Sequence, residues 1–383
     1  MKVLHICNDF CGSKVHGNLY RELDAQGVEQ VVYTYFVDSA LCDRNRFDAR
    51  STRFIYRPIL RPLHRLLYHK KQHDVYGDIK TQLSQSLHSF DLVHATTLFS
   101  DGGLAYCLYR DYGTPYVVSV RNTDVNAFLA YAPHTWATGI RVLRSAGRIV
   151  FISKAIKEKF CRHPLIRAIL PSIEEKIVIQ PNGIDAYWLD NVRKSPTANS
   201  HNVLYVGRFD RNKNVKRLCR AIVEMRSRYP DIQLQLVGGM ETRSMKDIIY
   251  TRAIENMISK YPQAIICHGK IYDKAVLRDV YAKCSAFAMP SFHETFGLVY
   301  LEALTQHLAI VYTKGQGVDG MLDPRVGEAV KASSKTDIKK AIDKIFTHRE
   351  DYLASEVVDF RQFRWNAIAS RYVDIYAHVR DTV

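Results

Sequence analysis

The sequence predicts an α/β protein built from two doubly wound, Rossmann-like domains, and three observations support this prediction. Short apolar segments typical of buried strands alternate with helical patterns along nearly the whole chain, which is the order of a parallel sheet flanked by helices. At 383 residues the chain exceeds the size that one hydrophobic core usually serves. The order of strands and helices also restarts after a polar stretch at 195–202. We therefore expect two similar domains in succession.

The first half opens with a strand, a loop and a helix. Residues 2–7 read as a buried strand, 8–13 as a loop that contains Gly12, and Leu19 and Leu23 recur at helical spacing. Further strands are expected at 28–35, 92–95, 115–120, 149–152 and 176–179. In such folds the loops that follow parallel strands line the ligand-binding edge of the sheet. We expect Gly12 and the polar loop 121–124 at that edge.

The second half repeats this order, with helical patterns between several of its strands. These strands are expected at 203–206, 233–237, 264–267, 286–289 and 308–312. From residue 338 to the end the pattern is helical, and its last part carries more apolar side chains than an exposed tail needs. A turn at 181–185 places the first domain at 1–182, a second at 183–362 and a C-terminal helix at 363–383.

The composition is that of an ordinary soluble globular protein, with 47% hydrophobic and 24% charged residues. No apolar run reaches the ~20 residues that cross a bilayer, and we expect no signal peptide because Lys2 leads directly into a strand. The eight cysteines are scattered, which favours reduced thiols and a cytoplasmic location. Their spacing does not indicate a zinc site.

The formal net charge of +15 calls for an anionic partner or surface. Nucleic acid is not expected, because no known nucleic-acid-binding motif is present. The excess is densest between Arg44 and Lys71, where an apolar stripe of Ile59, Leu63, Leu66 and Leu67 accompanies the basic residues. This pattern fits a basic amphipathic helix on an anionic membrane. It fits equally a solvated helix that packs on its own domain.

Two glutamates flank the expected start of a helix in the second half. Glu294 lies in a loop before Gly297, and Glu302 lies within the helix that follows. Eight helical steps span roughly 12 Å, about the length of a sugar joined through a diphosphate to a ribose. The free N–H groups at the start of the helix attract phosphate oxygens. Taken alone, two solvated surface carboxylates explain the spacing as well.

A basic loop follows the first strand of the second half. Arg208 can present a planar fork to phosphate oxygens, and Lys213 a compact charge. By itself such a loop is more often a solvated surface. Together with the helix that contains Glu302, it predicts a phosphate clamp.

These residues resemble the retaining glycosyltransferases of GT-B fold, the group 1 family with the Glu-x7-Glu motif that includes capsule and lipopolysaccharide enzymes. The matching elements are Val206-Gly207-Arg208-Phe209 with Lys213, Glu294 and Glu302 with Phe296-Gly297-Leu298 between them, 181–185, 91–95 and 363–365. The resemblance covers essentially the whole chain. It implies an N-terminal acceptor domain and a C-terminal donor domain facing across a cleft, with the last helix crossing back to the first.

The resemblance also implies roles for individual residues. The diphosphate would meet Arg208 and Lys213, and the transferred sugar would meet Glu294. The remaining donor-binding positions are the amides of Phe296, Gly297 and Leu298, the ribose ligand Glu302, Lys270 and Ile271 near the base, and Gly12 from the first domain. The catalytic set would be Glu294, Arg208, Lys213, Asp124 and Arg121.

One departure from the family concerns the acceptor side, where His94, Arg121 and Asp124 are the candidates. Arg121 stands where many relatives have a histidine, and arginine cannot act as a base near neutral pH. Asp124 and His94 remain candidates for that role. An ordinary core histidine is the favoured interpretation of His94.

The implied reaction moves a sugar from a nucleoside-diphosphate donor, UDP favoured over GDP, to a hydroxyl of a glycan or lipid-linked acceptor, with retention. The chain contains no Asp-x-Asp, so we expect no metal and no cofactor, with the cationic loop and helix N-terminus meeting the phosphate charge. We expect a role in cell-surface polysaccharide synthesis and a cytoplasmic location, with peripheral attachment to the inner face of the membrane as a further hypothesis.

Three alternatives stay open. Gly315-Gln316-Gly317-Val318-Asp319-Gly320 formally matches the dinucleotide-binding fingerprint of oxidoreductases, although the long helix that the fingerprint requires is interrupted by Pro324. A nucleotide-sugar epimerase would share the fold and work without an acceptor. A non-catalytic nucleotide-sugar binder would retain Arg208 and Glu302 but could dispense with the polar loop of the first domain.

Overall fold

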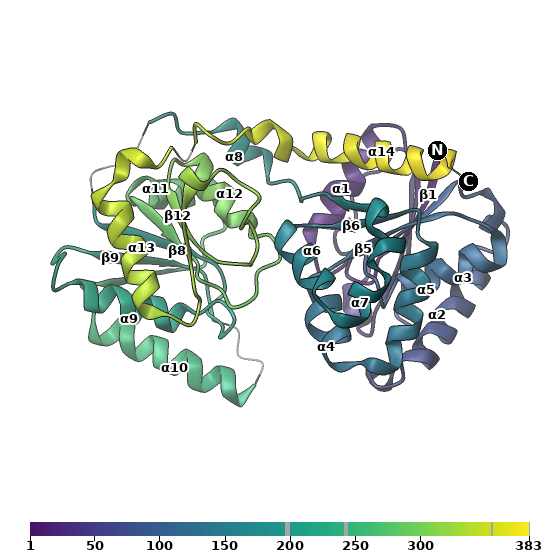
Figure 1. Ribbon diagram of the computed structural model, residues 1–383, viewed down its shortest axis with the longest axis horizontal. Coiled ribbons are helices and arrows are strands. Elements are labelled where there is room, and N and C mark those ends of the chain that lie inside the picture. The colour runs from purple at the N-terminus through teal and green to yellow at the C-terminus, as the bar shows by residue number, and fades with distance from the viewer. Residues whose placement is uncertain (196–199, 241–243, 354, 383) are drawn as a thin grey trace. The chain divides into compact units, whose positions relative to one another are not determined.

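The computed structural model describes residues 1–195, 200–240, 244–353 and 355–382. Part of the polar stretch expected at 195–202 therefore lies outside the described residues. The chain forms two compact units, one of residues 1–183 with 365–383 and one of residues 184–364. Each unit contains a sheet with helices packed around it (Figure 1).

The first unit is built on a seven-stranded sheet in the order β3-β2-β1-β4-β5-β6-β7. Every neighbouring pair is parallel. The strands are β1 Lys2–Ile6, β2 Glu29–Tyr35, β3 Thr52–Arg57, β4 Leu92–Ala95, β5 Tyr116–Val120, β6 Arg148–Phe151 and β7 Ile177–Ile179. The helices are α1 Lys14–Ala25, α2 Tyr68–Gln82, α3 Gly102–Tyr112, α4 Leu129–Tyr131, α5 Trp136–Ser145, α6 Lys154–Cys161, α7 Pro164–Ile169 and α14 Trp365–Asp381.

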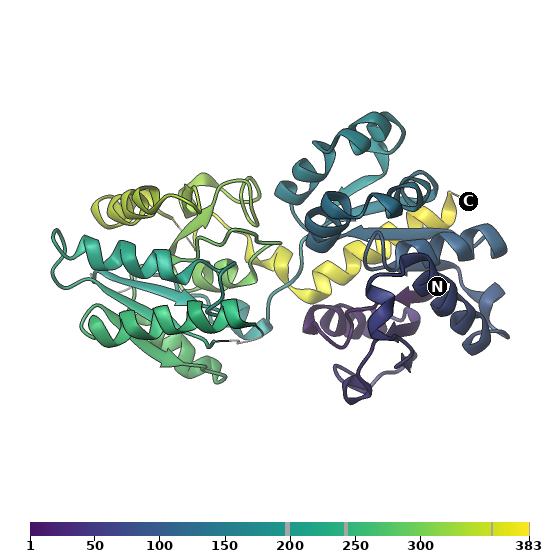
Figure 2. The same ribbon diagram turned by 90° about the horizontal axis from the view of Figure 1, so that it is seen from below.

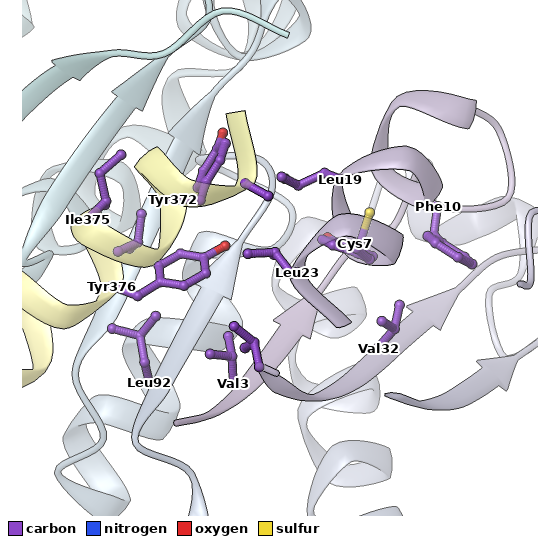
Figure 3. Packing of buried hydrophobic residues seen from close by; sticks show 14 of the residues in the cluster. Val3, Cys7, Phe10, Leu19, Leu23, Val32, Leu92, Tyr372, Ile375 and Tyr376 are labelled. Carbon is purple, nitrogen blue, oxygen red and sulfur yellow. The ribbon is translucent and has the colours of Figure 1, made fainter. Parts of the chain in front are cut away.

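The C-terminal helix α14 completes the core of the first unit. It packs against α1 and lies along the elements of this unit in both ribbon views (Figures 1 and 2). Tyr372, Ile375 and Tyr376 of α14 join a buried cluster with Leu23 of α1 and Leu92 of β4 (Figure 3). Burying each such side chain contributes about 1.5–3 kcal/mol. The apolar surface of the last helix is therefore core of the first unit.

The second unit has a six-stranded sheet in the order β10-β9-β8-β11-β12-β13, again parallel throughout. Its strands are β8 Asn202–Val206, β9 Gln233–Val237, β10 Ile265–Gly269, β11 Ala286–Ala288, β12 Ala309–Thr313 and β13 Gly327–Val330. Its helices are α8 Ala186–Asp190, α9 Val215–Met225, α10 Met245–Lys260, α11 Lys274–Ala282, α12 Leu298–Thr305 and α13 Lys335–Thr347. Two doubly wound α/β units are thus present, and the predicted fold class is confirmed.

The sequence analysis did not predict two edge strands. Its prediction of a basic amphipathic helix was wrong. β3 runs through the basic segment, and β13 forms the other missed edge. Instead of one helix, residues 59–71 contain a short 3-10 helix, Pro62–Arg65, and the first turn of α2. Pro62 stands at the first position of the 3-10 helix, where proline is tolerated, and it prevents a helix from continuing through it. Throughout the described ranges, no helix is both long and apolar enough to traverse a bilayer.

Candidate functional site

Two loops of the second unit are joined at the carboxyl edge of its sheet. One follows β8 and the other follows β11, and these strands are neighbours. Asn212 links the loops, because its carbonyl accepts from Phe292 N–H at 2.8 Å, its Nδ2 donates to His293 O at 2.9 Å, and its Oδ1 accepts from His293 N–H at 2.9 Å. The link fixes the path of the chain on both sides of residues 213 and 294.

Lys213 and Glu294 form an ion pair across these two loops. Lys213 Nζ lies 2.6 Å from Glu294 Oε2, and the two side chains are only 17% and 11% exposed. Glu294 Oε1 also accepts from Thr295 N–H at 3.1 Å. The structure thus brings together two of the residues proposed from the sequence, with opposite charges in direct contact.

Arg208 lies at the start of the same β8 loop. Its side chain is 51% exposed and its Nη2 lies 3.3 Å from Asp210 Oδ2. The Tyr205 hydroxyl donates to Arg208 O at 2.5 Å and holds the backbone there. Asp210 Oδ1 accepts from Lys213 N–H at 2.8 Å, so Asp210, which sequence reasoning passed over, orders both cationic positions.

The helix α12 starts immediately after Gly297, as the apolar spacing predicted. Gly297 has φ +83°, and a Cβ there would lie 2.4 Å from the Tyr300 ring. Only glycine fits this left-handed position without strain. Phe296 is buried and packs against Phe363, with ring centroids 6.1 Å apart. The chain thus passes from the Glu294 loop through Phe296 and Gly297 into Leu298, the first residue of the helix.

Glu302 lies half-buried in α12, near residues that the sequence did not single out for a role. Burial and the Asp185 carboxylate raise the pKa of Glu302 to about 7, and the Lys274 ammonium acts against that rise. Lys274 Nζ lies 2.5 Å from Asp185 Oδ2. Asp185 also caps α8 by accepting from Tyr187 N–H at 3.0 Å. Asp185 belongs to the matched segment 181–185, which was the available signal for it.

Lys270 and Ile271 follow β10 at the same edge of the sheet. The exposed Lys270 side chain lies over Gly239, since a Cβ on Gly239 would be 2.5 Å from Lys270 Cε. Gly238 N–H donates to Gly269 O at 2.8 Å and joins the loops that follow β9 and β10. The β9 loop is a contributor to this edge that the sequence did not indicate.

The carboxylate of Asp124, in the first unit, accepts hydrogen bonds from backbone N–H groups. Its carboxylate accepts from Leu98 N–H and Phe99 N–H, both at 3.1 Å, and from Arg121 N–H at 2.8 Å. Burial raises the pKa of Asp124 to about 6, although these three donors act against the rise. Arg121 Nε in turn donates to Thr96 O at 3.2 Å. The pair thus ties the loop after β5 to the loop after β4.

His94 is a core residue with 1% exposure. Its Nε2 shares a hydrogen bond with Ser119 Oγ at 3.1 Å, and its Nδ1 shares one with the Tyr376 hydroxyl at 2.8 Å. Burial holds the pKa of His94 well below its usual value. This environment supports the interpretation as a core histidine, because both ring nitrogens are engaged inside the unit.

Gly12 lies in the loop after β1, folded against Asp9. Gly12 N–H donates to Asp9 O at 3.0 Å, and a Cβ on Gly12 would lie 2.2 Å from Asp9 Oδ1. Burial raises the pKa of Asp9, and the Arg121 charge opposes this. Asp9 is a charged neighbour of Arg121 that the sequence analysis did not propose.

The glycine fingerprint at 315–320 leads into no long helix. Turns follow Gly320 up to a 3-10 helix of three residues, Pro324–Val326. Gly317 N–H donates instead to Glu294 O at 3.2 Å. This geometry opposes the dinucleotide-binding interpretation and places the segment against the Glu294 loop.

Comparisons with known proteins match both halves of the chain to glycosyltransferase domains. The family model described as "Glycosyltransferase Family 4" matches residues 13–187, and the model described as "Glycosyl transferases group 1" matches residues 190–355. The chain combines these two glycosyltransferase domains. It is therefore assigned as a glycosyltransferase.

Solved structures and a sequence relative extend the comparison. Sucrose-phosphate synthase from Thermosynechococcus elongatus has a TM-score of 0.76 at 19% identity, with 100% of both chains covered. Anabaena HepE in complex with UDP has a TM-score of 0.67 at 18% identity, covering 100% of this chain and 99% of that one. Both likenesses show the GT-B fold. A Bacillus subtilis glycosyltransferase assigned to teichuronic acid biosynthesis is 22% identical over 304 residues, 78% of this chain and 72% of that protein.

No cluster of three or more His, Cys, Asp or Glu side chains within the described ranges could hold a metal ion. Arg208 and Lys213, which the sequence analysis expects to meet phosphate, are cationic and would repel a metal ion. The independence from metal expected from the sequence remains a prediction.

Proposed function

We propose that this glycosyltransferase moves a sugar from a nucleoside-diphosphate donor to a hydroxyl of a glycan or lipid-linked acceptor. The donor is a UDP-sugar rather than a GDP-sugar, the stereochemistry at the sugar is retained, and neither metal nor cofactor is required. The product contributes to a cell-surface polysaccharide made on the cytoplasmic side. The complex of HepE with UDP and the teichuronic acid relative support the donor and the product class.

The observation that carries the proposal is the Lys213–Glu294 contact beside the start of α12. At 2.6 Å, with little exposure, it joins the residue proposed for phosphate to the residue proposed for the sugar. A diphosphate brings more negative charge than one carboxylate, so it competes for Lys213. Glu294 is then released to accept hydrogen bonds from sugar hydroxyls.

The proposed chemistry follows from charge. The bond between the anomeric carbon and the terminal phosphate oxygen breaks, and the anomeric carbon bonds to the acceptor oxygen on the same face. The acceptor proton passes to a phosphate oxygen of the leaving group. Arg208, Lys213 and the N–H groups around Gly297 stabilise the charge that builds up on the diphosphate. Glu294 orients the sugar so that its interactions strengthen in the oxocarbenium-like transition state.

The test combines binding with transfer. UDP and GDP are titrated by calorimetry, and labelled UDP-sugars are incubated with lipid-linked and oligosaccharide acceptors. We expect UDP to bind more tightly than GDP and label to move to an acceptor. In Lys213→Ala, affinity for both UDP and the UDP-sugar should fall about tenfold, which is ~1.4 kcal/mol. Lys260→Ala, on the exposed end of α10, serves as the control for loss of a lysine.

Three results would contradict the proposal. If wild type and Lys213→Ala bind UDP with equal affinity, Lys213 does not hold the diphosphate. Conversion of the donor to another sugar nucleotide without an acceptor would establish the epimerase alternative. Tight binding without either reaction would leave the non-catalytic binder.

A further inference from the structure

The loop after β12 holds the glycine-rich segment, which lies against the Glu294 loop and has so far been given no role. Gly315, Gly317 and Gly320 have φ values of +72°, +55° and +70°, a region that strongly favours glycine. Gln316 N–H donates to Thr313 O at 3.1 Å and closes a tight turn at the end of the strand. The glycines therefore set the position of one side chain, Gln316.

This loop forms two hydrogen bonds with the backbone of Glu294. Gln316 Oε1 accepts from Glu294 N–H at 3.2 Å, and Gly317 N–H donates to Glu294 O at 3.2 Å. A Cβ on Gly317 would lie 3.0 Å from Glu294 Cγ and 2.7 Å from Phe296 O, so any larger residue would push the loop away. Both backbone polar groups of Glu294 are thus bound by one loop.

These two backbone hydrogen bonds differ from the other contacts of Glu294, because donor binding is not expected to break them. On the carboxylate itself, Lys213 is the contact that a diphosphate would compete for. Asn212 holds residues 292 and 293, one step before Glu294. The bonds from Gln316 and Gly317 act on Glu294 itself and involve no group proposed to touch the donor. They persist while Lys213 changes partner.

We propose that Gln316 is a positioning residue that holds the Glu294 carboxylate where it meets hydroxyls of the transferred sugar. This inference rests on the proposed function. The acting atom is the Oε1 acceptor, so a glutamate in its place can still accept from Glu294 N–H, whereas a methionine of similar length cannot. A misplacement of about 1 Å in such a residue costs up to ~100-fold in rate.

The test compares three variants in the full-length protein. Gln316→Met should lose roughly 10- to 100-fold in kcat, while its Tm and its affinity for UDP stay close to wild type. Gln316→Glu should retain clearly more activity than Gln316→Met. Gln263→Met, in an exposed turn before β10, provides the matched control and should behave as wild type.

A binding cycle then shows whether Gln316 acts through Glu294. The ratio of the affinities for UDP-glucose and UDP reports the contribution of the sugar and needs no turnover. Gln316→Met should lower this ratio in the wild-type background and leave it unchanged in the Glu294→Ala background. An equal effect in both backgrounds, a wild-type kcat in Gln316→Met, or equal losses in Gln316→Met and Gln316→Glu would overturn the inference. Failure of the wild-type protein to bind UDP would instead overturn the proposed function.

Discussion

Two residues of the second unit, Lys213 and Glu294, carry opposite charges, and each stabilises the charge of the other. Lys213 and Glu294 are 17% and 11% exposed and 2.6 Å apart, so their interaction is screened by solvent far less than a surface pair. Removing one partner leaves the other charge poorly solvated. Substitutions here affect both ligand binding and stability, and the two effects require separate measurements.

Glu294→Ala should abolish sugar transfer, with a loss of at least ~100-fold, because the orienting carboxylate is gone. We expect the fold to remain, as followed by far-UV circular dichroism, and UDP to bind at least as tightly since Lys213 is released. Turnover is measured with the donor and acceptor that the transfer assay identifies. Glu255→Ala, at an exposed position of α10, is the control. Unchanged turnover in Glu294→Ala would refute the assignment.

Glu302 gives the ligand-free protein a stability that depends on pH. Its pKa is raised from 4.5 to about 7, so between these values the folded state binds more protons than the unfolded state. The contribution of Glu302 is fully present below pH 4.5 and is lost as pH rises through 7. In Glu302→Gln, urea unfolding should show a flatter decline of stability across this window than wild type. Parallel curves would contradict the raised pKa.

Sequence reasoning located residues at the correct edge of the sheet but could not tell which of them touch. Lys213 and Glu294 were proposed separately, each from the end of a strand, and their ion pair depends on the neighbouring order of β8 and β11. Asp185 and Lys274 form a similar long-range pair near Glu302. Asp124 is an example of the opposite kind, because only coordinates reveal that its oxygens are occupied by backbone donors.

At the level of elements, the basic segment between Arg44 and Lys71 shows how charge can hide a strand. Within β3, Arg53 and Arg57 flank the apolar Phe54, Ile55 and Tyr56 and obscure their strand pattern. The leucines read as a helical stripe lie instead around the 3-10 helix Pro62–Arg65. Leu63, Leu66 and Leu67 are 65%, 78% and 47% exposed. These three leucines therefore do not pack on their own domain, as the competing interpretation required, whereas Ile59 is partly buried.

We propose that these leucines contact an anionic membrane surface, together with basic residues of the same segment such as Arg61 and Lys70. Leu63→Glu combined with Leu66→Glu should abolish co-sedimentation with phosphatidylserine-containing liposomes. Neutralising Arg61 and Arg65 with glutamine should weaken it, most visibly at low salt. Ile249→Glu, at a 64% exposed position on α10, is the matched control. Equal sedimentation of all variants would remove the membrane hypothesis and leave solvent-exposed leucines.

At the level of the whole molecule, the prediction of two parallel sheets succeeded because most of the strands carry their own apolar signal. The order of the strands within each sheet and the edge strands β3 and β13 were not predicted. Edge strands bury less surface, so their apolar pattern is weaker. The structure also assigns α14 to the first unit, since the helix completes a core built from residues 3–150.

The position of α14 affects how the protein is made. During synthesis on the ribosome, residues 1–183 emerge first but lack the helix that covers Leu23 and Leu92 until residues 365–383 follow. At usual translation rates the delay is on the order of ten seconds or more. The nascent first unit exposes apolar surface for that time, whereas the second unit is contiguous and can fold as it emerges. The later part of the chain is thus expected to mature before the earlier one, and chaperones would be needed mainly by the part that was made first.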